Sequence, residues 1–229
     1  MPATIYREPH INKVNYDPLT FTPIILLTDY TFGIAVKADA PWKTWQAFIA
    51  AAKTQPGMIN IGVPGFLSSP SLYMQEIAQA VGISLNVVPF KGDGETITAL
   101  LGNHIEIAPL TGTASQYIEA GKIRYLVMLT EQRIPRYPDV PTLRESGVDI
   151  WIESPYGIVG PQGMDPAQVK ILHDAFKTAL YSERSKQVMA LLNQQIHYKG
   201  PQDYQQYMRA TYEQEAQRVR SLRKAGIVQ

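Results

Sequence analysis

Two adjacent serines, Ser68 and Ser69, are the residues of this sequence best placed to do chemistry. They stand between a strand-like run and a helix-like run in the stretch from Ile59 to Val81. Ser69 is predicted to cap the helix, with Pro70 at its first position. Hydroxyls beside the unpaired N–H groups of a helix N-terminus form a receptor for a carboxylate or a phosphate. The competing interpretation is a strand-to-helix link that binds nothing, as most such links do.

A second hydroxyl pair repeats this arrangement later in the chain. Thr111 and Thr113 flank Gly112, between a predicted strand at 104–109 and a predicted helix at 114–120. The same combination of hydroxyls and helix-start N–H groups therefore occurs twice. An anion is again the ligand that this combination favours.

Catalytic and metal-binding patterns are weak by comparison. The histidines do not have the spacing of metal ligands, and the chain has no cysteine for a thiolate site. Ser68 and Ser69 lack the flanking glycines of a nucleophile elbow, which leaves a hydrolase triad with His104 as a minor alternative. Lys91 follows a predicted strand, but the full spacing of a phosphate loop is absent. The sequence thus favours binding without catalysis, with no metal or cofactor.

Composition is that of an ordinary globular protein. The 229 residues are 45% hydrophobic and 18% charged, with a net charge of +1. This balance gives no electrostatic footprint for nucleic acid. No run has the length of a membrane helix, and the start of the chain does not resemble a signal peptide. No export signal is therefore expected in the chain as given.

Alternating apolar patterns predict the elements that position these loops. Trp45 and Phe48 fall at helical spacing and are expected in the core rather than in a ligand box. Residues 1–13 read as an irregular surface arm, and the polar face of the last helix reads as solvated. The alternation of strands and helices predicts α/β layers with largely parallel sheets. The predicted strands are a short one ending near 27, then 32–37, 59–61, 85–90, 104–109, 123–129, 151–160 and 195–199; the predicted helices are 42–52, 70–81, 95–101, 114–120, 166–180, 183–192 and 201–225.

Taken together, several short runs resemble the Bug, or TctC-like, family of extracytoplasmic solute-binding proteins of tripartite tricarboxylate transporters. The resemblance extends from Tyr16 onward, in the family's order, and the block from Pro138 to Gly147 is its most specific part. The runs are Y-D-P-x-x-F-x-P-I, G-V-P-G-F-L-S-S-P-S-L, V-P-F-K-G-D-G, L-L-G-N-H-I-E, A-G-K-I-R-Y-L-V, R-x-P-x-Y-P-D-V-P-T-L-R-E-S-G and G-I-V-G-P-Q-G-M-D-P.

The resemblance implies an α/β, periplasmic-binding-protein-like (type II) bilobed fold with the first lobe incomplete. Residues 1–36 together with 155–229 would be the remnant of the first lobe, and residues 37–154 the second lobe. A small organic carboxylate would be bound for the membrane components of a tripartite transporter, in the periplasm and without catalysis. The ligand residues that the resemblance implies are Phe66, Leu67, Ser68, Ser69, Thr111, Gly112 and Thr113.

The sequence also departs from the family pattern. Leu67 stands where the family usually has Gly, Ser71 where it has His, and Asp93 where it has a small residue. The family's export signal, opening strand and first ligand loop are not found, so we expect exposed strand edges that a second copy or a donated segment would cover. The alternative function is an interaction or regulatory module, possibly a homodimer, that keeps the fold but not the ligand clamp.

Overall fold

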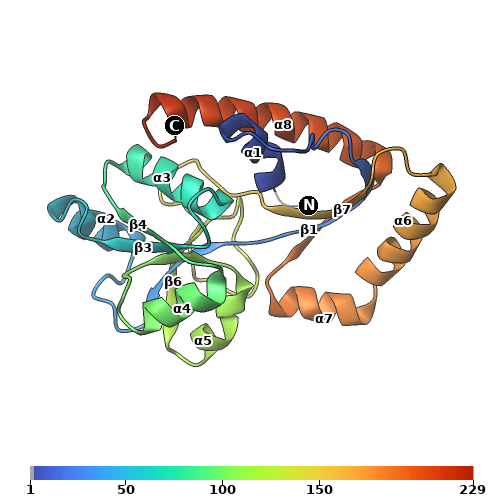
Figure 1. The fold of residues 1–229 in the computed structure, drawn as a ribbon. Helices are drawn as coiled ribbons and strands as arrows, with labels where there is room; N and C mark the ends of the chain where they lie inside the picture. The colour runs from blue at the N-terminus through green and yellow to red at the C-terminus, as the bar shows by residue number, and fades with distance from the viewer. Residues whose placement is uncertain (1–2, 229) are drawn as a thin grey trace. The chain divides into compact units, whose positions relative to one another are not determined.

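The protein's structure, a computed structural model, describes residues 3–228 and divides into two compact units (Figure 1). Unit 1 consists of Met1–Asp29, Ser154–Ala190 and Gln194–Gln229. Unit 2 consists of Tyr30–Glu153 and Leu191–Asn193. The lobes predicted from the sequence, with boundaries after residues 36 and 154, stay a prediction.

Unit 1 is built on a three-stranded sheet in the order β7-β1-β8, and both neighbours run antiparallel to the central strand. The strands are β1 (Thr22–Asp29), β7 (Pro155–Gly160) and β8 (Gln195–Lys199). The helices of this unit are α1 (Thr4–Ile11), α6 (Pro166–Leu180), α7 (Glu183–Leu191) and α8 (Pro201–Lys224).

In unit 2, β2 lies between β5 and β6 and runs antiparallel to both, while β3 and β4 pair in parallel. A parallel bridge between Ile61 and Ile107 places β3 next to the chain that enters β5. The strands are β2 (Gly33–Lys37), β3 (Asn60–Val63), β4 (Asn86–Pro89), β5 (Ala108–Leu110) and β6 (Ile123–Met128); the helices are α2 (Trp45–Thr54), α3 (Ser69–Val81), α4 (Asp93–Leu101), the 3-10 helix η1 (Gly112–Ala114) and α5 (Ser115–Glu119).

The prediction of largely parallel sheets is wrong, and the connections explain why. Strands joined through helices, such as β3 to β4 and β7 to β8, run in one direction, as crossover connections require. β1 leads into β2 through the short segment 30–32 without a helix, and each of the two runs against the other strands of its own sheet. β5 and β7 also begin later than predicted, at Ala108 and Pro155.

Side-chain alternation along β2 gives unit 2 two cores, one on each face of the sheet. Ile34 and Val36 pack with α2 and α3, whereas Ala35 packs with α4 on the opposite face (Figure 1). Trp45 and Phe48 are 2% and 0% exposed, which confirms that they belong to the core. This packing holds the strand-to-helix loops on a rigid scaffold.

The prediction that residues 1–13 form an irregular surface arm is wrong for the described part, because Thr4–Ile11 is the helix α1. α1 packs along α8. Arg7, which is fully buried, forms a bidentate ion pair with Glu215. The Arg7 Nε and Nη2 atoms lie 2.6 and 3.0 Å from the two Glu215 oxygens. Glu215 is 6% exposed, so the face of α8 toward α1 is not solvated.

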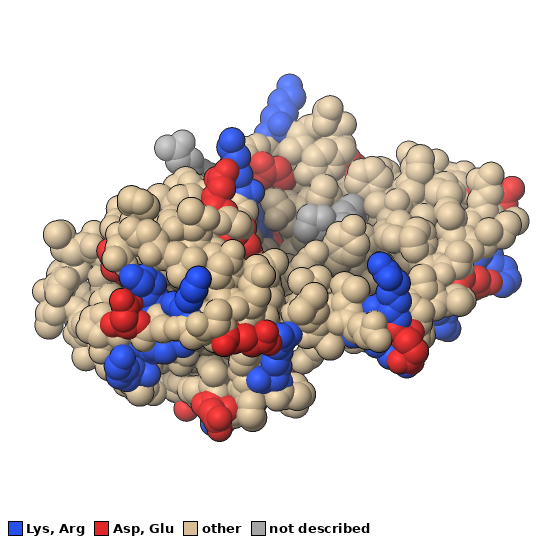
Figure 2. All heavy atoms as spheres, turned by 90° about the horizontal axis from the view of Figure 1, so that it is seen from below, with Lys and Arg blue, Asp and Glu red and all other residues tan. Residues whose placement is uncertain are grey.

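No helix in the described part of the chain is long and apolar enough to cross a membrane. Figure 2 shows acidic and basic side chains interspersed on one face of the molecule, in keeping with the net charge of +1.

Replacing Glu215 by Ala should lower the free energy of unfolding by about 3 to 5 kcal/mol, because it leaves the buried Arg7 cation without its carboxylate. Glu213→Ala is the matched control, since Glu213 is exposed on the same helix. Urea unfolding of the two variants measures the difference. Equal losses in the two variants would show that the ion pair does not anchor α1.

Candidate functional site

The segment between β3 and α3, residues 64–69, is called the serine loop below. Gly65 has a φ of +93°, a left-handed conformation that favours glycine and turns the chain sharply after β3. Ser68, rather than the predicted Ser69, caps α3: its Oγ accepts a hydrogen bond from the Ser71 N–H at 3.3 Å. The Ser68 hydroxyl donates to the Gly65 carbonyl at 2.8 Å. Since that proton points to a backbone carbonyl rather than to a base, this geometry does not activate Ser68 as a nucleophile.

One hydroxyl beside the serine loop is buried without a partner. Ser71 is fully buried, and among the described residues its Oγ has no hydrogen-bond partner. A buried, unpaired hydroxyl is unfavourable, so such a group calls for a water or a ligand. The first turn of α3 also contains no acidic residue. The serine loop therefore lies at the positive end of α3, beside the unpaired Ser71 hydroxyl, and the first turn of this helix carries no carboxylate.

Apolar side chains flank these hydroxyls. Phe66 is 46% exposed, although it is a large aromatic side chain, and Leu67 is half-buried. Ser69 is 4% exposed. The serine loop thus combines hydroxyls with an exposed ring, a mixture suited to an acid with an apolar body.

The threonine loop, residues 111–113, has a different environment because a carboxylate of the chain already fills it. The Asp93 Oδ2 atom accepts hydrogen bonds from the Thr111 hydroxyl at 2.5 Å and from the Thr113 hydroxyl at 2.7 Å. It also accepts from the Thr111 N–H at 3.2 Å. The hydroxyls of this loop thus bind a carboxylate of the chain itself, and the binding of a ligand by Thr111–Thr113 stays a prediction.

A buried tyrosine forms a hydrogen bond with the backbone of the threonine loop. The Tyr125 hydroxyl donates to the Thr111 carbonyl at 2.9 Å. Burial raises the pKa of Tyr125, and the neighbouring Tyr137 and Asp93 raise it further, so the hydroxyl stays a protonated donor.

Gly112 lies against the chain rather than against open space. A Cβ atom at Gly112 would come within 1.9 Å of the Leu192 carbonyl oxygen, so only glycine fits there. Thr31 and Arg136 fix the same segment, 191–193, by donating to its carbonyls at 2.6 and 2.9 Å. In this structure Gly112 therefore positions the segment 191–193.

The order of the strands brings the serine loop, the threonine loop and the loop before Asp93 to one edge of unit 2. β3 lies between β4 and the chain entering β5, and all three run in the same direction. The loops that follow their carboxyl ends are the serine loop, the loop before Asp93 and the threonine loop. Ligands of α/β proteins bind at such an edge. The sequence did not predict the contact between Asp93 and the threonines, although the departure at Asp93 from the family pattern was a signal for it.

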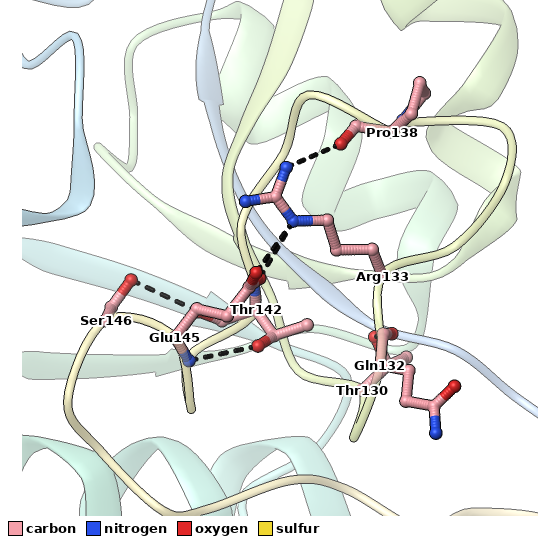
Figure 3. Close-up of polar contacts among 7 residues, drawn as sticks. All are labelled: Thr130, Gln132, Arg133, Pro138, Thr142, Glu145 and Ser146. Carbon is pink, nitrogen blue, oxygen red and sulfur yellow. Dashed lines mark hydrogen bonds and ion pairs between the residues drawn. The ribbon is translucent and has the colours of Figure 1, made fainter.

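The block most specific to the family resemblance forms a structural brace (Figure 3). Arg133 Nε lies 3.0 Å from both Glu145 oxygens, and Arg133 Nη1 donates to the Pro138 carbonyl at 2.7 Å. Glu145 accepts from the Thr142 N–H at 2.7 Å, and Thr142 Oγ1 accepts from the Glu145 N–H at 3.1 Å. This reciprocal pattern is that of a capping box, here in a turn rather than at the start of a helix. The block includes none of the predicted ligand residues.

A groove of about 690 Å³ in unit 1 also contains none of the predicted ligand residues. His173, in its wall, already contacts Asp174 at 2.8 Å and Tyr198 at 3.0 Å. We assign no ligand to this groove. The described residues also include no group of three or more His, Asp or Glu side chains arranged to hold a metal ion.

Comparison with known proteins gives one family. The sequence model of the "Tripartite tricarboxylate transporter family receptor", TctC, matches residues 1–226. A UPF0065 protein from the gbd 5' region of Cupriavidus necator is 40% identical over 212 residues, which are 92% of this chain and 65% of that protein. The chain spans 49% to 65% of the length of the first curated relatives that it matches.

Solved structures give the same fold. The periplasmic binding protein BugD is 24% identical, with a TM-score of 0.90 over 100% of this chain and 77% of BugD. The R. palustris protein Rpa4515, solved with adipate, is 23% identical, with a TM-score of 0.90 over 100% of this chain and 77% of its own. The predicted class, an α/β fold of the periplasmic-binding-protein type, is therefore confirmed. The incompleteness of the first lobe stays a prediction.

The Arg133–Glu145 brace should make stability depend on pH. The hydrogen bond from Arg133 holds the pKa of Glu145 below its ordinary value of 4.5, and the Thr142 N–H lowers it further. A carboxyl whose pKa falls on folding stabilises the protein above its unfolded pKa and loses this effect as the pH falls through its folded pKa. Glu145→Gln should therefore lower the melting temperature at pH 7, and the gap should shrink as the pH falls below about 4.5.

Melting curves of the wild type and Glu145→Gln at pH 7, 5 and 3 measure this gap. Glu213→Gln removes the same charge from an exposed position and controls for net charge. A gap of the same size at pH 7 and pH 3 would contradict the role of the brace.

Proposed function

Because the chain belongs to the tripartite tricarboxylate transporter receptor family, we propose that it binds a small organic carboxylate at the serine loop, reversibly and without catalysis. The observation that carries this proposal is the start of α3, where the buried Ser71 hydroxyl has no partner among the described residues and the first turn has no acidic side chain. The ligand residues proposed here are Phe66, Leu67, Ser68 and Ser69, with Ser71 added.

Hydroxyls are expected to contribute more to this binding than backbone N–H groups. Pro70 has no N–H, and the N–H of Ser71 is already bonded to Ser68 Oγ. A bound carboxylate would accept a hydrogen bond from the Ser68 hydroxyl, after this hydroxyl turns from the Gly65 carbonyl, and another from the Ser71 hydroxyl. The positive end of the α3 dipole would add to both.

The comparisons support the ligand class and the setting. The structure of Rpa4515 contains adipate, a carboxylate, and BugD is a periplasmic binding protein. We propose that this chain likewise works in the periplasm and delivers its ligand to the membrane components of a tripartite transporter. Nucleic acid is not among the proposed partners.

One observation favours a second function. Of the two predicted ligand loops, the threonine loop is filled by Asp93. An interaction or regulatory module that keeps the fold without the full ligand clamp would show such a filled loop. Pairing with a second copy of the chain belongs to this alternative and stays a prediction. Binding of a carboxylate to the purified protein separates the two functions.

Ser68→Ala should weaken carboxylate binding by tenfold or more, whereas Thr44→Ala should leave it unchanged. Thr44 caps α2, also in unit 2, by accepting from the Ala47 N–H at 3.1 Å. Loss of either cap lowers the free energy of unfolding by about 1 kcal/mol, so the pair separates lost binding from lost stability.

A panel of mono-, di- and tricarboxylates, aromatic acids included, provides the ligands. An acid at about 100 times its dissociation constant stabilises the folded chain by about 2.7 kcal/mol, which raises the melting temperature by several degrees. Calorimetric titration of the most stabilising acid then gives the affinities of the variants. Wild-type affinity in Ser68→Ala would overturn the assignment of the serine loop, and the absence of any stabilising acid would favour the interaction module.

A further inference from the structure

We propose that Asp93 determines ligand specificity: it occupies the threonine loop as a built-in anion, and the site therefore prefers an acid with one carboxylate over an acid with two. This inference rests on the proposed binding of a carboxylate at the serine loop. It adds to that function a residue that selects among carboxylic acids.

Asp93 and the loop itself account for the hydrogen-bond donors of the two threonines. Both threonine hydroxyls and the Thr111 N–H donate to Asp93 Oδ2. The remaining donor, the Thr113 N–H, bonds to Thr111 Oγ1 at 3.3 Å. A second carboxylate of a ligand would have to displace Asp93 to reach the two hydroxyls or the Thr111 N–H.

The start of α4 is negatively charged. Its first turn carries two acidic residues, Asp93 and Glu95, and Glu95 accepts from the Lys91 N–H at 3.1 Å. The first turn of α3 carries none. The two helix starts therefore differ: α4 has acidic side chains at its own positive end, whereas α3 does not. Like charges that meet at a binding site oppose association, so an external anion is disfavoured at α4 and favoured at α3.

Asp93 lies at the same edge of unit 2 as the serine loop. Asp93 follows β4, and its carboxylate reaches the loop that follows β5. β3, which leads into the serine loop, pairs with β4 on one side and is bridged to the chain entering β5 on the other. A ligand that has one carboxylate at the serine loop therefore has the negative charge of Asp93 at the same edge of unit 2. The second carboxylate of a dicarboxylate would be repelled by this charge, whereas the uncharged far end of a monocarboxylate would not be.

The test compares acids that differ only in the second carboxylate, namely hexanoate with adipate and butyrate with succinate. Calorimetric titration gives the ratio of the dicarboxylate to the monocarboxylate affinity for each protein. The wild type should prefer the monocarboxylates. Asp93→Gly, which frees the threonine donors, should raise the ratio by tenfold or more. Asp93→Asn, which removes the charge and keeps an acceptor in the loop, should raise it less.

Glu95→Gln is the matched control, since it removes one negative charge from the same turn without freeing the threonine donors, and it should raise the ratio much less than Asp93→Gly does. Adding Thr113→Val to Asp93→Gly should reverse the gain, because the second carboxylate would then lose a hydroxyl donor. If Asp93→Gly does not fold, the affinity ratio of Asp93→Asn still tests the role of Asp93.

Three outcomes would overturn the inference. A wild type that binds the dicarboxylates as tightly as the monocarboxylates would do so. An unchanged ratio in both Asp93 variants, with monocarboxylate binding intact, would overturn the role of Asp93 and leave the proposed function standing. No binding of any of these acids or of the wider panel, by any of these proteins, would overturn the proposed function together with the inference.

Discussion

Polar donors at the ends of β-strands need acceptors, and in this chain that need is met in two different ways. The threonine loop directs two hydroxyls and an N–H to the carboxylate of Asp93. At the start of α3, Ser68 meets the need in part by capping the helix, while the Ser71 hydroxyl stays buried without a partner among the described residues. An unsatisfied buried hydroxyl is the kind of feature that a ligand or a water stabilises. The difference between the two loops underlies both the proposed function and the proposed specificity.

The rest of unit 2 keeps these loops in place. Alternating side chains of β2 pack a core on each face of the sheet, so the ends of β3, β4 and β5 are held together. Gly112 permits close contact with the Leu192 backbone, and the Arg133–Glu145 brace closes the segment after β6. Arg133 and Glu145, which belong to the run most specific to the family, thus have a structural role in this chain.

The sequence predicted most elements of the fold because their signals are local. The apolar spacing of α3, α6 and α8 and the glycine and proline breaks around them indicate helices with nearly the observed bounds. The helix α1 was missed because its anchor is a buried ion pair between Arg7 and Glu215, 208 positions apart, and charged residues read as surface. For the same reason the contact of Asp93 with Thr111 was not predicted, although each loop was recognised on its own. The Ser68 cap was misplaced by one residue, because two adjacent serines give the same signal.

Binding of the carboxylate at the serine loop is tested most directly by titrating the ¹⁵N-labelled protein with the monocarboxylate that stabilises it most. The titration is followed through the backbone amide signals. The account predicts the largest shifts at Phe66, Leu67, Ser68, Ser69 and Ser71, with the signals of Thr111 and Thr113 nearly unchanged because Asp93 already holds those groups. Large shifts at Thr111 and Thr113, or none at residues 66–71, would contradict it.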